Sequence, residues 1–358
     1  MPAVKAVNPR EIFSPEDWAA ITCVSNPHGI WLIAHAWLMV IAAAWGCALL
    51  WQWHWLAGLA SSPLALIIMG GRQLGLAILM HEAAHGLLHR NRKINNFLGQ
   101  WLAGAATGAD LHAYRAYHLT HHKYTQQVED PDLGLSAPFP VSRASLQRKA
   151  IRDLTGQTFF KQRRFQWQMA WTGLRAMLAG GPTKQTAPAG NAPSTKRDTS
   201  AGRTFNPQSG SGSGSNGPAT NLDGAKQTAR TVGRFLLIQA VILACSLATL
   251  GWTPFLLWLG ALATTFPLFL RIRNIAEHAC TQTGSGDPFT HARTVRAGLI
   301  ERATVAPYWV NYHSEHHLFM GVPCYHLAAA HRLLGTGGFH PRMTIAPGYL
   351  SVMRQVIA

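Results

Sequence analysis

Charged side chains are scarce in this sequence, and acidic ones are the scarcest. Asp, Glu, Lys and Arg together make up 13% of the 358 residues, while hydrophobic residues make up 48%. Soluble proteins usually carry about 25% charged residues. The composition therefore argues against an ordinary soluble protein, and the length allows one large domain or two small ones.

Cysteine is also infrequent. The five cysteines are odd in number and far apart, so no disulfide framework is visible. Residues 1–18 are polar, and the first apolar run is not followed by a cleavage site, so we expect no signal peptide.

The positive charge is unevenly distributed. The net charge of +16 comes from 31 Lys and Arg against 15 Asp and Glu, a balance that often indicates nucleic-acid binding. Here 20 of the Lys and Arg lie between residues 81 and 234 and 8 between residues 271 and 358, whereas the connections at 51–55 and 252–254 carry none. This asymmetry follows the positive-inside rule of membrane proteins. It favours a multi-span membrane protein and argues against a nucleic-acid partner.

Four apolar runs are long enough, or nearly so, to cross a bilayer as helices. They cover residues 31–50, 55–80, 235–251 and 255–270. Short Trp-containing turns join the runs in pairs, which predicts two helical hairpins. The expected fold is all-α, with four transmembrane helices and a helical cap on the cytoplasmic side, where both termini would also lie.

The expected organisation has a single main domain. We predict a cytoplasmic segment at 1–30, the domain itself at 31–340 and a tail at 341–358. Residues 181–226 contain almost no large apolar side chains and predict a flexible loop that interrupts the domain. Arg72 and Gln73 stand inside the second apolar run, where polar groups usually have a function or a partner. Helical geometry places Arg72 opposite His81, and the sequence gives it no role.

Histidine is frequent, at 18 residues, and is clustered in three boxes. The boxes read HEAAH, HLTHH and HSEHH, and their histidines are His81, His85, His118, His121, His122, His313, His316 and His317. On a helix, positions i, i+3 and i+4 lie on one face, so each box can present two or three imidazoles to one point.

Chance does not account for the boxes. One HxxHH could arise in roughly one chain of this composition in twenty, but two of them with an HxxxH, all beside ends of apolar runs on one side, form a far rarer coincidence. Burying eight imidazoles without a metal or partners would also be costly. Imidazole ligands with open positions suit iron, copper, zinc or nickel.

The number of histidines points to two metal ions. HEAAH alone would match a membrane zinc protease with Glu82 as base, but one zinc needs only three protein ligands. Ferritin-type carboxylate sites need two Glu-x-x-His pairs, and Glu82–His85 is the only such pair at the boxes. Eight histidines suffice for a pair of iron ions that bind and reduce dioxygen.

The three boxes, ordered around two hairpins, resemble those of the membrane fatty acid desaturase family. Residues 118–132 (HLTHHKYTQQVEDPD), Asn311-Tyr312 before the third box and residues 322–326 (VPCYH) after it are also similar to that family. The resemblance covers about residues 30–180 and 230–340. Carotenoid ketolases, carotenoid hydroxylases and alkane hydroxylases share related boxes, so the substrate stays open.

The resemblance implies further site residues, cofactors and partners. NIAEH at 274–278 is similar to an element in which the histidine is another metal ligand and the asparagine reaches iron through water, roles that it assigns to His278 and Asn274. It implies two non-haem irons, dioxygen as co-substrate and a fatty acyl or lipid substrate, with no catalytic residue beyond the metal centre. No GxGxxG or HPGG element is present, so the electron donor should be a separate protein of the ferredoxin or cytochrome b5 type.

Other polar residues receive lesser roles. We expect Glu82, Glu277 and Asp130 to hydrogen-bond the outer nitrogens of ligand histidines. His89, His112, His326 and His331 are expected to be structural, surface or supporting groups.

Overall fold

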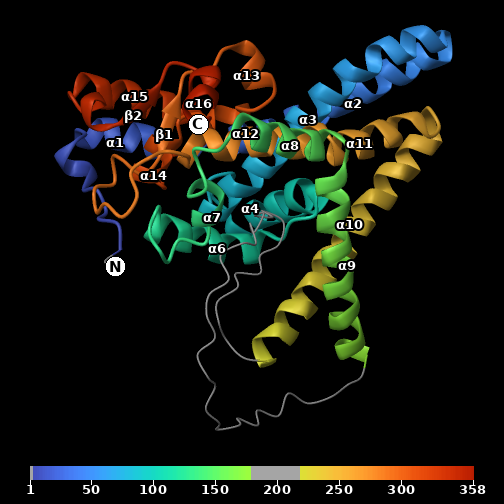
Figure 1. Cartoon of the computed structure of the whole chain (residues 1–358), viewed down its shortest axis with the longest axis horizontal. Coiled ribbons are helices and arrows are strands. Elements are labelled where there is room, and N and C mark those ends of the chain that lie inside the picture. Colours follow the sequence, from blue (N-terminus) through green and yellow to red (C-terminus); the bar gives the residue numbers. More distant parts are fainter. Residues whose placement is uncertain (1–2, 179–217) are drawn as a thin grey trace.

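A computed structural model describes residues 3–178 and 218–358 of the chain, and most of these residues are helical (Figure 1). The helices of the N-terminal half are η1 (Pro9–Glu11), α1 (Pro15–Thr22), α2 (Asn26–Trp53), α3 (Trp55–His85), α4 (Arg92–Phe97), the π-helical segment η2 (Leu98–Gly104), α5 (Ala105–Thr107), α6 (Leu111–Tyr124), α7 (Leu133–Ser136), α8 (Arg143–Leu154) and α9 (Gln157–Leu178). The helices of the C-terminal half are α10 (Pro218–Thr249), α11 (Thr253–Ala263), α12 (Thr265–His278), α13 (Leu299–Ala303), η3 (Pro307–Trp309), α14 (His313–Leu318), η4 (Cys324–His326), α15 (Leu327–Thr336), η5 (His340–Arg342) and α16 (Tyr349–Gln355).

Four stretches of the described residues are long and apolar enough to cross a membrane, as predicted. They are Asn26–Trp53, Trp55–His85, Asp223–Thr249 and Thr253–His278. Each is longer than the predicted run, because hydropathy detects the hydrocarbon-facing part while the helix continues beyond it. The extensions matter, since those of α3 and α12 carry His81, His85 and His278.

The fourth stretch is divided between α11 and α12. The break falls at Thr264, which has φ −122° and ψ −75°. Pro267 lies four residues after Ala263 and has no N–H to donate to the Ala263 carbonyl, which explains an interruption here. The side chain of Thr265 instead donates a hydrogen bond to the carbonyl of Leu66 in α3, at 2.7 Å.

Helix α3 lies at the centre of the molecule. In the most apolar part of α3, 67% of the residues are buried, against 17% in the most apolar part of α10. It packs against α2, η2, α6, α11 and α12. The helices α9 and α10 lie side by side and extend away from the rest (Figure 1). Because α3 ends in the first histidine box, the most enclosed of the four apolar stretches also positions the site.

Close packing in this core depends on glycine at Gly29 of α2. A Cβ atom there would lie 1.8 Å from the Leu88 carbonyl oxygen, which is backbone and cannot easily move. We expect Gly29→Ala to cost about 1–3 kcal/mol of stability and to lower the temperature at which the detergent-purified protein aggregates. Gly46→Ala in the same helix is the matched control, since a Cβ there meets nothing within 4 Å. Equal behaviour of the two variants would contradict the packing described here.

Two sequence predictions need correction. The fold is not entirely α-helical, because β1 (Arg293–Val295) and β2 (Thr344–Ala346) form a parallel pair with Thr294 opposite Ile345. Strands of three residues are too short for an alternating pattern to reveal them. The predicted loop at 181–226 ends too late, because α10 begins at Pro218 and Ala225 packs against Gly173 of α9. The remainder of that loop, 181–217, lies outside the described residues.

The N-terminal segment packs next to the third box, and α16 near the C-terminus packs against α12 and β2. Phe13 and Trp18 contact Phe319, with ring centroids 5.0 and 5.6 Å apart. Val352 of α16 is buried, and Val356 just beyond it is buried as well. Residues 3–30 and 341–358 thus pack onto the rest of the fold.

Candidate metal centre

The first two boxes lie toward the C-terminal ends of their helices, and the third lies on a short helix. The first forms the last turn of α3, which stops at Gly86 in the left-handed conformation (φ +84°), a common way to end a helix. The second lies on α6, whose first turn is capped by Asp110 accepting a hydrogen bond from the Ala113 N–H. The third forms most of α14. His278 is the last residue of α12.

These elements bring nine histidines into two adjacent clusters. Cluster A consists of His81, His85, His118, His122 and His316, and cluster B of His121, His278, His313 and His317. Within each cluster, one nitrogen from every ring lies within 4.8 Å of all the others. Each HxxHH box contributes to both clusters. Two imidazoles of each HxxHH box face one cluster, within the predicted two or three, and the third imidazole of each box faces the other cluster.

Helix geometry explains how a box is divided. At about 100° per residue, positions i and i+4 differ by about 40°, whereas i+3 and i+4 differ by about 100°. The i and i+4 residues of the second box, His118 and His122, accordingly share cluster A, and His121 faces cluster B. In the third box, His313 and His317 face cluster B while His316 faces cluster A.

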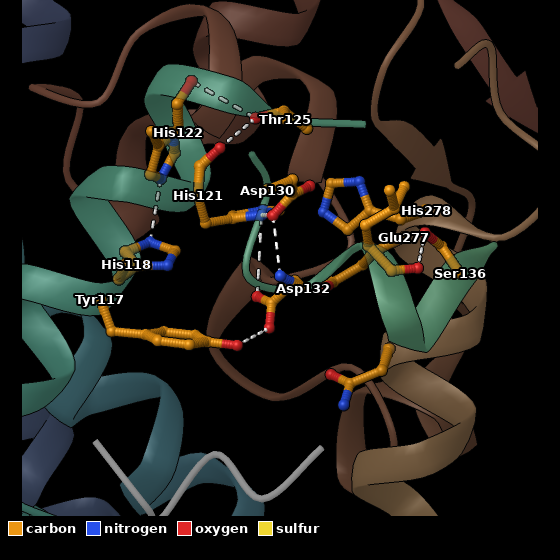
Figure 2. A network of polar contacts seen from close by, with 12 residues as sticks. Tyr117, His118, His121, His122, Thr125, Asp130, Asp132, Ser136, Glu277 and His278 are labelled. Carbon is orange, nitrogen blue, oxygen red and sulfur yellow. Dashed lines mark hydrogen bonds and ion pairs between the residues drawn. The ribbon is translucent and has the colours of Figure 1, made fainter. Parts of the chain in front are cut away.

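Ring nitrogens within each cluster lie close together. In cluster A, the Nε2 atom of His122 is 2.9 Å from that of His118 and 3.0 Å from that of His316 (Figure 2 shows the first pair). In cluster B, the Nε2 atom of His313 is 2.8 Å from that of His278 and 3.0 Å from that of His317. The nitrogens thus converge on one small region in each cluster.

The outer nitrogens of cluster B are held by the surrounding protein. His121 donates from Nδ1 to Asp130 at 2.8 Å (Figure 2), and His278 donates to the His291 carbonyl at 3.0 Å. His317 Nδ1 is 3.3 Å from the hydroxyl of Thr125, whose own proton goes to the His121 carbonyl. These bonds fix each ring with Nε2 turned inward.

Carboxylates support the third box as well. Glu277 lies 3.4 Å from Nδ1 of His313 and pairs with Arg273 at 2.5 Å. Glu315 belongs to the third box and is fully buried. It accepts hydrogen bonds from Thr294 of β1 and from His331. The parallel strand pair therefore helps to orient α14, a contribution that the sequence did not reveal.

Electrostatics favour neutral imidazoles in most of the site. Burial lowers the pKa of His118, His122, His313, His316 and His317 well below the ordinary value, and the neighbouring histidines lower it further. His121 differs. Burial alone would lower its pKa, but the carboxylates of Asp130 and Asp132 outweigh burial and raise it. A neutral ring keeps a lone pair free, which a metal ligand requires.

Asn274 lies beside cluster B. With Tyr114, Arg273 and histidines of the cluster it lines a cavity of about 40 Å³, enough for a water molecule. The Oδ1 atom of Asn274 accepts a hydrogen bond from Arg273 at 3.1 Å.

The remaining histidines lie outside the clusters, whereas Glu82 lies 3.4 Å from the Nδ1 atom of His81 in cluster A. His112 is exposed on α6, and His89 accepts a hydrogen bond from the Asn91 N–H. Glu82 accepts one from the Cys324 N–H at 2.9 Å, which ties the first box to the segment after the third. His326 is half-buried next to Tyr325, and His331 reaches the site only through Glu315.

Asp130 offers a test of the outer contacts. Its buried carboxylate accepts hydrogen bonds from His121, from the Gln126 N–H and from the Asp132 N–H, each at 2.8 Å. Asp130→Asn keeps the shape but weakens the acceptor, so we expect metal affinity and turnover to fall by roughly 10- to 100-fold. Glu129→Gln alters the neighbouring exposed carboxylate and should leave both unchanged. Similar values for the two variants would show that Asp130 does not support the site.

Comparison with known proteins agrees with this geometry. Over 277 residues the chain is 25% identical to dihydrorhizobitoxine desaturase from Bradyrhizobium elkanii, covering 76% of this chain and 67% of that protein. Over 113 residues it is 29% identical to beta-carotene ketolase from Paracoccus sp. (strain PC1), covering 30% of this chain and 40% of the ketolase. The family model described as fatty acid desaturase matches residues 53–189 and 202–340. The chain is therefore an oxidoreductase and a member of the fatty acid desaturase family, whose boxes its two histidine clusters contain.

Proposed function

We propose that this protein is an oxygen-dependent membrane desaturase that introduces a double bond into a fatty acyl substrate at a histidine-held pair of irons. The observation that carries the proposal is the convergence of nine histidines into two adjacent clusters at the ends of α3 and α12. One iron would be held by cluster A and the other by cluster B. Asn274 would reach the second iron through water.

The residues fit such metal ions. Two nitrogens about 2.1 Å from one ion and 90° apart lie about 3.0 Å from each other. The Nε2 separations of 2.8–3.0 Å in both clusters match this spacing. Among the described residues, the buried Nε2 atoms of His81 and His85 have no hydrogen-bond partner. Because buried polar atoms are seldom left unpaired, these nitrogens support a ligand inside cluster A.

The irons would supply the chemistry that no side chain can, removal of hydrogen from an unactivated carbon with dioxygen as oxidant. Overall, a CH2–CH2 unit, dioxygen, two electrons and two protons give CH=CH and two waters. The chain's own residues orient the imidazoles through Asp130, Thr125 and the His291 carbonyl. Buried residues surround both clusters and keep bulk water away.

Two electrons must come from another protein. Acidic carriers such as ferredoxin or cytochrome b5 would be attracted to the 20 Lys and Arg between residues 81 and 234, which outnumber the Asp and Glu there. We propose such a carrier as the partner.

For the membrane topology, we propose two helical hairpins with both termini, the boxes and the basic residues in the cytoplasm. Residues 31–340 then form the desaturase domain. The concentration of Lys and Arg outside the turns at 51–55 and 252–254 supports this orientation.

The second candidate is oxygenation of a carotenoid or an alkane at the same centre. The match to beta-carotene ketolase favours it, although that match covers only 30% of this chain. The family assignment and the second histidine cluster both speak against a membrane zinc protease.

Lipid profiling of an expression host distinguishes these functions. If the proposal holds, cells that produce the protein accumulate unsaturated acyl chains absent from cells that produce His118→Ala. New ketone or hydroxyl groups on supplied β-carotene, with an unchanged acyl profile, would favour the second candidate instead.

A further inference from the structure

Two cavities of the described residues meet at the side chain of Tyr308. The outer one, of about 280 Å³, lies between α2, α3 and η3, and its walls include Trp31, His35, Arg72, Tyr308 and Trp309. The inner one, of about 10 Å³, is mostly apolar and reaches His81, His313 and His316. Tyr308 lines both cavities. Tyr308 is therefore shared by the outer cavity and the cavity that reaches the histidine clusters.

Arg72 brings an uncompensated charge to the outer cavity. Its side chain is buried, with 6% exposed, although it stands in a membrane-spanning helix. Its Nη2 atom donates to the carbonyls of Arg302 and Ala303, each at 3.0 Å, and the guanidinium lies 5.4 Å from the centre of the Tyr308 ring. No carboxylate of the described residues pairs with it. Carbonyl dipoles satisfy hydrogen bonds but do not neutralise a buried cation, which is costly to leave without a counter-ion.

The surrounding backbone is fitted closely to this arrangement. A Cβ on Gly71 would lie 2.1 Å from the Ala303 carbonyl oxygen, and one on Gly75 would lie 2.6 Å from the Tyr308 ring. Tyr308 and Trp309 have φ of +52° and +57°, a strained region for residues other than glycine. Strain of this kind is held in place by surrounding contacts and is common at functional sites.

A second polar group faces the same ring. Nδ1 of His35 on α2 lies 3.0 Å from the Tyr308 hydroxyl. Arg72 and His35 thus approach Tyr308 from two helices, while Trp31, which is 56% exposed, stands at the outer margin. Trp at such a position suits a boundary between lipid and water.

We propose that the outer cavity binds the carboxylate of an aliphatic substrate, with Arg72 as its counter-ion, and that the aliphatic chain passes Tyr308 toward the clusters. The planar guanidinium matches a carboxylate. A cavity of this size is below the usual range for drug-sized ligands, so it suits a free acid better than a nucleotide-sized carrier. Nine residues of α3 separate Arg72 from His81, an axial rise of roughly 13 Å, which sets the distance between carboxylate and reacting carbons.

This inference rests on the proposed function, because only a desaturase would use the bound acid as its substrate. Its test, however, measures binding alone. Full-length protein in detergent is titrated calorimetrically with sodium octanoate and with methyl octanoate, which differ in charge and share the chain. We expect octanoate to bind at least tenfold more tightly than the ester. Arg72→Gln should remove that preference while leaving the metal content unchanged. Arg72→Lys should retain part of it, and Arg296→Gln, an exposed arginine outside the cavity, should retain all of it.

Equal affinity of the wild-type protein for acid and ester would overturn the proposal, and this comparison does not depend on any variant folding. So would an Arg72→Gln variant that weakens both ligands alike, since that outcome indicates lost packing instead of lost charge. Preferential octanoate binding in a protein that leaves the acyl profile of its host unchanged would refute the desaturase function while leaving the carboxylate site in place.

Discussion

Replacement of His316 or His317 with alanine is expected to abolish turnover, although the two residues are neighbours that belong to different clusters. Each substitution removes an inward-facing nitrogen, so the loss should exceed the roughly 10- to 100-fold effect of losing an outer contact such as Asp130. The measurement is desaturated product formed in membranes supplied with substrate, dioxygen and reductant. The same loss is expected at the other seven clustered histidines.

His112→Ala is the matched control for these variants. It removes an imidazole from α6, which carries three of the clustered histidines, but the His112 ring is exposed and belongs to neither cluster. We expect most of the activity to remain. An inactive His112→Ala protein with normal expression, or an active His317→Ala protein, would show that membership of a cluster does not determine function.

Removal of the metal should inactivate the protein and also destabilise it. The buried imidazoles of both clusters would then lie 2.8–3.0 Å apart with no ion between them. A ligand present at about a thousand times its dissociation constant stabilises a folded state by about 4 kcal/mol, so chelation should lower the thermal midpoint by at least about 5 °C. Differential scanning fluorimetry of the detergent-solubilised protein, before and after dialysis against a chelator, checks this.

Readdition of different metals separates the structural from the redox contribution. Iron(II) should restore both the midpoint and turnover, whereas zinc, which has no redox chemistry, should restore only the midpoint. The His118→Ala protein should respond less to the chelator than the wild type. An unchanged midpoint after complete removal of the metal would mean that the clusters do not hold it.

The sequence was sufficient to identify the histidines because their chemistry is local. HEAAH, HLTHH and HSEHH are each only five residues long, and the structure places all eight of their histidines in the two clusters. The division of HLTHH between two clusters also follows from helix geometry, provided that its histidines are allowed to face two separate metal positions instead of one. His278 stands alone in its segment, and only the resemblance to desaturases singled it out.

The features that remained hidden depend on contacts between distant segments. Arg72 was conspicuous within an apolar run, yet its partners Arg302, Ala303 and Tyr308 belong to another part of the chain. Three-residue strands such as β1 produce no periodic pattern, so the support that Thr294 gives to Glu315 could not be foreseen. The extent of α10 was underestimated because its first residues are polar and only its later part is apolar.

If the two clusters hold a pair of irons, metal analysis of the purified protein will detect both ions. Protein produced in iron-replete medium and isolated without chelators is examined by elemental analysis, together with His316→Ala and His317→Ala. We expect about two irons per wild-type chain and a lower iron content in each variant. One zinc per chain with activity retained, or an iron content that is unaffected by both substitutions, would contradict it.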